Sequence, residues 1–272
     1  MTQILLKPAR LPVLFLGHGS PMTMITDNPA RAAFRALGTL LPRPDAILCI
    51  SAHWETQGKS HLTAGGHPRT MHDFRGFPPE LYALQYPAPG SAALVDRVTG
   101  LLGADRAMPD ESWGFDHGAW GVLLPMFPAA NIPTVVLSLD RSLGLEEHLV
   151  LGAALAPLRD EGVLIVGSGN VVHNLARWRE STGTVPDWAD EFRTRINRAV
   201  AANDIASLTR FPPGDQAAAA AINSAEHYLP LLYAVGARLP GDGVTAFNDT
   251  VDGSLSMTSY LIGDPVLAAS VQ

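Results

Sequence analysis

The sequence predicts an α/β protein: one domain over residues 1–272, in which helices form a sandwich around a mostly parallel or mixed central sheet. Short apolar runs rich in β-branched residues alternate with segments of helical spacing along most of the chain. A chain of 272 residues with 47% hydrophobic content is also long enough to bury one large core. We found no internal repeat that would indicate a solenoid or a propeller instead.

Composition and charge argue against several classes of partner. The formal net charge is -7 and Lys and Arg form no cluster, so we expect neither a nucleic acid nor a membrane surface as partner. The first residues lack a signal-peptide core and no apolar run is long enough to span a membrane, which predicts a cytoplasmic protein.

The single cysteine, Cys49, lies among apolar residues, where we expect a buried thiol. The oligomeric state stays open.

The first elements predict a strand, a helix and a second strand. The apolar run LPVLFL at 11–16 is typical of a buried strand, and it ends at Gly17. Residues 28–41 have apolar side chains at helical spacing, and the run AILCIS at 46–51 predicts the next strand. Because a helical crossover usually joins parallel strands, the carboxyl ends of both strands should lie at one edge of the sheet.

The middle of the chain contains two segments with little periodicity. Residues 55–90 are rich in Gly, Pro, His and aromatic residues, which is typical of a functional lid or a binding loop. A helix is expected at 91–102. Residues 110–120 form a second polar and aromatic segment, which leads into a short apolar segment at 122–126.

Two further strands are expected in the second half of the chain, at 132–139 (IPTVVLSL) and at 162–166 (GVLIV). A helix at 146–159 should connect them. Three more helices are expected after these strands; they lie at 188–203, at 217–221 and from residues 224–227 onward. The tail predicts a hairpin that closes the sheet, with strands at 244–248 and 254–262 around a turn at 252–253.

Histidines follow three of the predicted strands. His18 lies between two glycines after the first strand, His53 follows the second strand, and His173 comes shortly after the strand at 162–166. Ligands of open α/β sheets bind at the carboxyl ends of strands, so we expect these side chains to share one site. Neutral imidazole is a favoured ligand of zinc, iron and copper. The pattern therefore predicts a metal site at this edge, with His117 and His227 as further candidates.

Other motifs are absent or incomplete. The segment 167–172 (GSGNVV) begins like a dinucleotide-binding loop, but Val172 occupies the position of its third glycine. The chain has no P-loop and no Gly-x-Ser-x-Gly nucleophile elbow. These absences argue against a nucleotide-binding protein and a serine hydrolase.

Several blocks of the sequence carry a resemblance to a known family. They are GHGSPM at 17–22, SAHW at 51–54, MHDFRGFPPELY at 71–82, YPAPG at 86–90, FDHGAW at 115–120, GSGNVVHNL at 167–175 and EHYLPLLYA at 226–234. In these blocks and in their order the chain resembles the DODA-type extradiol ring-opening dioxygenases, the class III group of the LigB superfamily. The resemblance covers nearly the whole chain.

The resemblance implies an activity and a set of residue roles. The expected enzyme is an Fe(II)-dependent extradiol dioxygenase that opens the ring of a catechol, DOPA-like or a related phenolic acid, with O2 to a muconic semialdehyde. His18 and His53 are implied as metal ligands, and His227 completes the set. His173 is implied as a further ligand or as the catalytic acid and base, and His117 as a catalytic residue that contacts the substrate.

Four residues are the expected substrate contacts, and they are Trp54, His72, Arg75 and His117. Arg75 suits a substrate carboxylate. More distant members of the superfamily complete a two-His, one-carboxylate site with Glu, so Glu226 is an alternative to His227, which we favour. Zn(2+) is an alternative bound metal, because zinc accepts the same imidazoles. A zinc-dependent hydrolase and a non-catalytic Memo-like interaction protein are the alternative functions.

Overall fold

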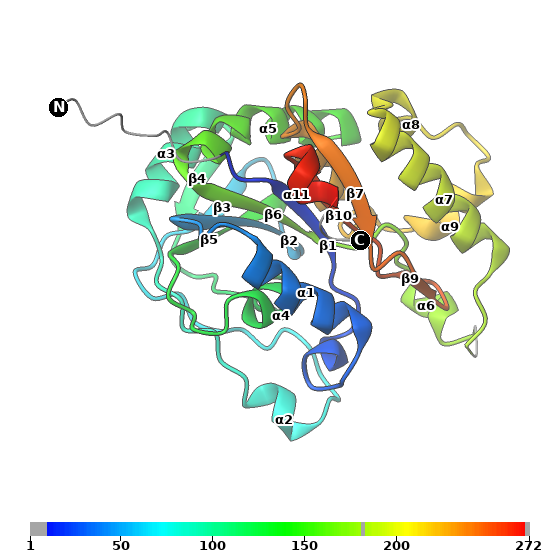
Figure 1. Ribbon diagram of the computed structural model, residues 1–272, viewed down its shortest axis with the longest axis horizontal. Coiled ribbons are helices and arrows are strands. Elements are labelled where there is room, and N and C mark those ends of the chain that lie inside the picture. The colour runs from blue at the N-terminus through cyan, green and yellow to red at the C-terminus, as the bar shows by residue number, and fades with distance from the viewer. Residues whose placement is uncertain (1–9, 181–182, 270–272) are drawn as a thin grey trace.

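The computed structural model describes residues 10–180 and 183–269 (Figure 1). The strands of its main sheet are β1 (Val13–Gly17), β2 (Ala46–Thr56), β3 (Ser60–Thr63), β4 (Ala107–Asp110), β5 (Thr134–Asp140), β6 (Val163–Gly169), β7 (Gly243–Phe247) and β10 (Ser259–Gly263). Their order is β4-β3-β5-β2-β6-β1-β10-β7. The four central strands, β5, β2, β6 and β1, run parallel to one another, whereas β10 pairs antiparallel with β1 on one side and with β7 on the other. The predicted class, α/β with a mixed sheet, is confirmed.

Helices cover both faces of this sheet and form a lobe at its β7 end (Figure 1). They are α1 (Pro29–Leu40), α2 (Pro79–Tyr82), α3 (Ala92–Leu102), α4 (His117–Met126), α5 (Leu145–Leu155), α6 (Leu175–Trp178), α7 (Asp187–Ala202), α8 (Ile205–Thr209), α9 (Gln216–Ala221), α10 (Leu229–Gly236) and α11 (Pro265–Ala269). Two 3-10 helices, η1 (Pro21–Met24) and η2 (Ala156–Glu161), complete the set within the described residues. None of the described helices is long and apolar enough to cross a membrane.

The sheet separates two hydrophobic cores. Along β1, Val13 and Phe15 enter one core, whereas Leu14 and Leu16 enter the other, as the alternation of a strand requires. Helices α3 and α5 pack on the first face, and α1 and α4 pack on the second (Figure 1). Helix α10 also packs on the first face. Cys49 is buried in the second core as a free thiol, as predicted.

Several elements differ from the prediction. Strand β2 continues past residue 51 to Thr56, through a register shift against β5 between Ile50 and Glu55. The segment predicted as a lid contains the edge strand β3 and the short helix α2, and β4 was not predicted. The apolar segment at 122–126 is the second half of α4, a helix buried on nearly every side, which explains why it lacks periodicity.

The carboxyl-terminal elements also differ in detail. Helix α7 ends where Asn203 adopts the left-handed conformation with φ of 55°. Helix α10 begins at Leu229, later than predicted, because Pro230 occupies its first turn. The predicted hairpin is formed by β7 and β10, but a small second hairpin, β8 (Val251–Asp252) with β9 (Leu255–Ser256), interrupts it.

The carboxyl ends of the central strands lie level with one another. Gly17 at the end of β1 pairs with Gly169 at the end of β6, and Ser51 of β2 pairs with Ser168. A side chain at Gly169 would have its Cβ 2.2 Å from the carbonyl oxygen of His227, so only glycine lets that residue approach the strand. The fold thus gathers distant histidines at one edge.

A buried histidine far from this edge predicts a dependence of stability on pH. His148 of α5 is fully buried, its Nδ1 lies 3.1 Å from the hydroxyl of Tyr233, and burial lowers its pKa to about 4. The unfolded chain takes up this proton near its ordinary pKa of about 6.5. His148 therefore destabilises the fold progressively as the pH falls from about 6.5 to about 4, by about 3 kcal/mol in total.

Urea unfolding at about pH 7.5 and about pH 5 tests this expectation. The free energy of unfolding of a His148→Gln variant should fall less between the two pH values than that of the unmodified protein, by about 2 kcal/mol. An equal fall in both proteins would contradict it.

Candidate metal centre

His18 and His53 meet at the aligned strand ends. His18 directly follows β1, and His53 lies near the end of β2, on the other side of β6. Their Nε2 atoms are 3.1 Å apart, and the side chain of His53 is 19% exposed. The two strands were predicted to deliver these histidines to one place, and the structure brings them together.

His227 and His173 form a second pair beside the first. His227 lies just before α10, and its carbonyl accepts a hydrogen bond from the backbone N–H of Asn170 after β6. Its ring centre is 5.2 Å from that of His18 and 5.1 Å from that of His53. The ring of His173 stacks on that of His227, with centres 3.4 Å apart and planes 6° apart. The loop after β6 thus adjoins the turn before α10.

His117 is the fifth histidine of the cluster. It is the first residue of α4, whose amino end is capped by Asp116. Its ring centre lies 3.9 Å from that of His53 and 5.8 Å from that of His18. The Nδ1 atom of His117 is 2.9 Å from Oδ2 of Asp73, a residue of the predicted lid.

Five histidines that are far apart in the sequence, together with Glu226, therefore form two adjoining groups of side chains that could hold a metal ion. Ligand atoms lie within 4.8 Å of one another in each group; the groups are His18, His53 and His117, and His173, Glu226 and His227. Sequence reasoning named all five histidines but divided them differently, with His227 beside His18 and His53.

Hydrogen bonds fix which nitrogen of each ring faces the cluster. The hydroxyl of Ser168 donates to the carbonyl of Gly118, so its oxygen accepts from Nδ1–H of His18 at 3.0 Å. Nδ1–H of His227 donates to Oε1 of Glu226 at 2.9 Å. In both rings the unprotonated nitrogen is then Nε2. Such outer partners, which set the tautomer of a metal-binding histidine, were missed by sequence reasoning.

Burial keeps the imidazoles neutral. It is the largest cause that lowers the pKa of His18, His53 and His227 well below the ordinary value, and neighbouring imidazoles add to the effect. Burial also lowers the pKa of His173 to about 4, against the opposite effect of Glu226. At neutral pH all four offer a lone pair, which is the form that binds metals and accepts protons.

The other predicted substrate contacts lie in different surroundings. Trp54 is 4% exposed and stacks on Trp113, with ring centres 5.3 Å apart. His72 bonds the carbonyl of Leu84 through Nε2 at 3.0 Å, while Arg75 is exposed. Their contact with a substrate stays a prediction.

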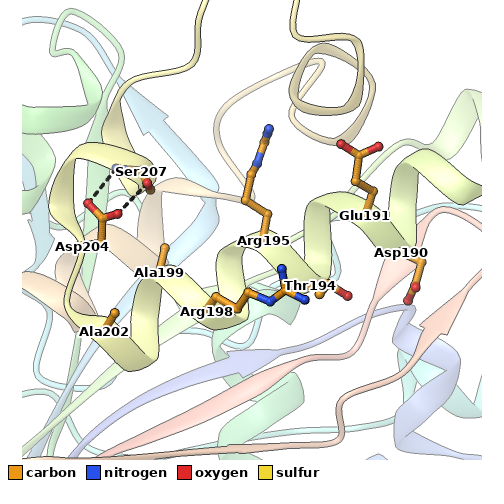
Figure 2. A pocket seen from close by; sticks show the side chains of 9 residues that line it. All are labelled: Asp190, Glu191, Thr194, Arg195, Arg198, Ala199, Ala202, Asp204 and Ser207. Atoms are coloured by element: carbon orange, nitrogen blue, oxygen red, sulfur yellow. Dashed lines mark hydrogen bonds between the residues drawn. The ribbon is translucent and has the colours of Figure 1, made fainter.

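A small cavity adjoins the histidine cluster, whereas a larger cleft lies elsewhere on the protein. A small one of about 10 Å³ adjoins the cluster and is lined by His18, Ser20, His117 and Trp120, among others. A larger cleft of about 610 Å³ lies on α7 and around the start of α8, and none of the five histidines lines it (Figure 2). The size of a cleft therefore does not locate the chemistry of this protein.

Comparison with known proteins shows the family to which the chain belongs. A family model described as the catalytic LigB subunit of aromatic ring-opening dioxygenase matches residues 12–253. The chain belongs to the LigB family. This LigB chain is 45% identical to the 4,5-DOPA dioxygenase extradiol of Escherichia coli K12, over 96% of the chain and 97% of that relative. It is 36% identical to the protein of the same name from Beta vulgaris, over 90% and 94% of the two chains.

A solved structure supports the same family. The crystal structure of an uncharacterized protein from Escherichia coli K12 superposes on the LigB chain with a TM-score of 0.77 and 39% identity. The match covers 93% of this chain and 100% of the other. Together these matches confirm the predicted class of enzyme, an extradiol ring-opening dioxygenase of DODA type.

Proposed function

We propose that this protein is an Fe(II)-dependent extradiol dioxygenase that opens the ring of a DOPA-like catechol or a related phenolic acid with O2, giving a muconic semialdehyde. The observation that carries the proposal is the meeting of three neutral imidazoles at the edge of the sheet, in a family of ring-opening dioxygenases. The names of the relatives supply the substrate class.

His18, His53 and His227 are the proposed ligands. Two nitrogens that each lie roughly 2.1 Å from one ion are about 3 Å apart at an angle near 90°, and Nε2 of His18 and Nε2 of His53 are 3.1 Å apart. The corresponding ring centres would be about 4.6 Å apart at 90° and about 5.3 Å apart at a tetrahedral angle. The three rings lie 4.9, 5.2 and 5.1 Å apart, within this range.

His117 fits the ligand set less well than His227. Its ring centre is only 3.9 Å from that of His53, which is closer than two imidazoles on one ion would be. Its Nδ1 is held by Asp73, on the side of the predicted lid. We therefore propose that His117 contacts the substrate and does not bind the metal.

Glu226 is proposed as the outer partner of His227 and not as a ligand. Its Oε1 accepts from Nδ1–H of His227 and from the hydroxyl of Ser224, both at 2.9 Å. A carboxylate that accepts from the far nitrogen of a ligand histidine raises the basicity of that ligand.

This assignment predicts opposite results for two neighbouring variants. Glu226→Gln should retain the metal with an affinity lowered about 10- to 100-fold, whereas His227→Ala should lose it. Competition with a chelator of known affinity, followed by metal analysis, measures both. Loss of metal from Glu226→Gln with full retention in His227→Ala would favour the carboxylate as ligand.

When bound, Fe(II) supplies a centre at which both catechol oxygens and O2 meet. His173 is proposed as the general base, because it lies beside His227 and its imidazole is neutral, which is the form that can accept a proton. His117 is proposed to hydrogen-bond a substrate hydroxyl through Nε2, since its Nδ1 is engaged by Asp73. The proposed substrate contacts of Trp54, His72 and Arg75 remain as predicted, with Arg75 for a carboxylate.

The identity of the metal is part of the proposal. An all-imidazole set accepts Zn(2+) as readily as Fe(2+), so the purified protein can carry zinc while activity requires iron. Neither of the alternative functions, a zinc-dependent hydrolase and a Memo-like interaction protein, is favoured, because the family model and the named relatives are ring-opening dioxygenases.

Anaerobic reconstitution with Fe(II) tests the proposed function. Oxygen uptake and absorbance are then followed with DOPA, protocatechuate, gallate and caffeate. Oxygen consumption with a new yellow chromophore is the expected result, and its rate ranks the substrates. No uptake with any catechol by protein that contains iron would overturn the proposal.

A further inference from the structure

We propose that Asp73 is a positioning residue, which holds the imidazole of His117 in its place beside the substrate. The inference rests on the proposed function, because it assigns a role to a residue of that same site.

The contact between Asp73 and His117 has two points. Oδ1 of Asp73 accepts the backbone N–H of His117 at 2.8 Å, and Oδ2 accepts Nδ1–H at 2.9 Å. The first bond fixes the carboxylate on the amino end of α4, and the second fixes the rotation of the imidazole ring. A ring held at Nδ1 presents Nε2 as its free nitrogen.

The same carboxylate oxygen reaches a second histidine. Oδ2 of Asp73 lies 3.4 Å from Nδ1 of His53, and the side chain of Asp73 is only 16% exposed. One residue of the segment between β3 and α2 thus faces a proposed metal ligand on β2 and a proposed substrate contact on α4.

No other carboxylate in the described residues makes these contacts. Asp116 precedes His117 in the sequence, but its oxygens accept from the hydroxyl of Ser51, the indole N–H of Trp113 and the backbone N–H of Ala119. Asp116 therefore caps the amino end of α4, and Asp73 is the carboxylate that binds the imidazole of His117.

The residue after Asp73 supports this arrangement. Phe74 meets the ring of His117 edge to face, with centres 5.5 Å apart and planes 84° apart. The imidazole is bonded at Nδ1 by one residue and packed by the next, so the predicted lid carries both restraints. This gives the segment a role in the reaction besides covering the substrate.

Nitrogen-15 NMR of the full-length protein loaded with Zn(2+) gives a readout that does not depend on turnover. With labelled histidine, the signals of His117 are assigned by their absence in His117→Gln. We expect Nδ1–H of His117 in the unmodified protein and in a Glu80→Gln control from helix α2 of the predicted lid. In Asp73→Asn the Nδ1–H signal should weaken in favour of Nε2–H. An unchanged His117 spectrum in Asp73→Asn would overturn the inference.

Kinetics of the Fe(II)-loaded protein supply the second test. Asp73→Asn should retain its metal and lose about 10- to 100-fold in kcat, with a smaller change in KM. The same substitution in a His117→Gln background should cost much less, because the residue through which Asp73 acts is already absent. Equal costs in both backgrounds, or an equal loss in Glu80→Gln, would overturn the inference.

The two proposals fail in different ways. If no catechol is opened but His117 changes tautomer in Asp73→Asn, the positioning role stands and the proposed reaction falls. If catechols are opened and His117 does not respond to Asp73, the reaction stands and the positioning role falls.

Discussion

Replacing His18 by alanine is expected to reduce the bound metal to background and to abolish ring opening. Nε2 of His18 lies 3.1 Å from Nε2 of His53, so its loss removes one corner of the proposed ligand triangle. An open coordination shell of two imidazoles holds a divalent metal far more weakly than three do. The loss should exceed the roughly 100-fold that an outer partner costs. Metal analysis after Fe(II) reconstitution and desalting measures it.

A matched control separates this effect from the loss of any histidine. His67 is exposed and lies outside the cluster, so His67→Ala should keep both metal and activity. Circular dichroism of each variant checks that the fold is retained. Full metal content in a His18→Ala, His53→Ala double variant would contradict the ligand assignment.

His173→Ala is expected to keep its metal and to lose turnover by a factor of about 10² to 10⁴, the range typical of general acid and base catalysis. His173 stacks on His227 but lies outside the proposed triangle, and burial lowers its pKa to about 4, so it is a neutral base at neutral pH. Single-turnover absorbance after mixing the Fe(II) protein with catechol and O2 measures the step directly.

Metal content distinguishes the two roles proposed here, since a variant of a ligand should lose its metal and a variant of the general base should keep it. A His173→Ala protein that loses its metal together with its activity would assign His173 to the ligand set, which is the other role that the family resemblance implies. A His173→Gln variant that keeps the metal and stays inactive would support the role in proton transfer.

The parts of the site that depend on topology were predictable from sequence. Two apolar runs end just before His18 and His53, and a helical crossover joins them. This predicts parallel strands with both residues at one edge, and the registers of β1, β2 and β6 agree. These arguments need only the periodicity of short segments. His117 and His227 were further candidates by their context, and the family resemblance then implied their roles.

The parts that depend on side-chain contacts across loops were not predictable. Asp73 meets His117 because a segment with little regular structure folds over α4, and no periodicity encodes that approach. Strands β3 and β4 have four residues each, which is too short for a pattern. His227 was expected at the amino end of a helix, but α10 begins only at Leu229, with Pro230 in its first turn, so the histidine lies in the preceding turn.

The proposed ligands come from β1, β2 and the turn before α10, so most of the chain separates the first from the last. Contacts between residues so distant in sequence form slowly and late during folding. A metal held by these three ligands would therefore bind only once the sheet has brought them together. The binding free energy would then be added to the native state, so metal supply would set how long the protein survives proteolysis, if the proposed ligands bind it.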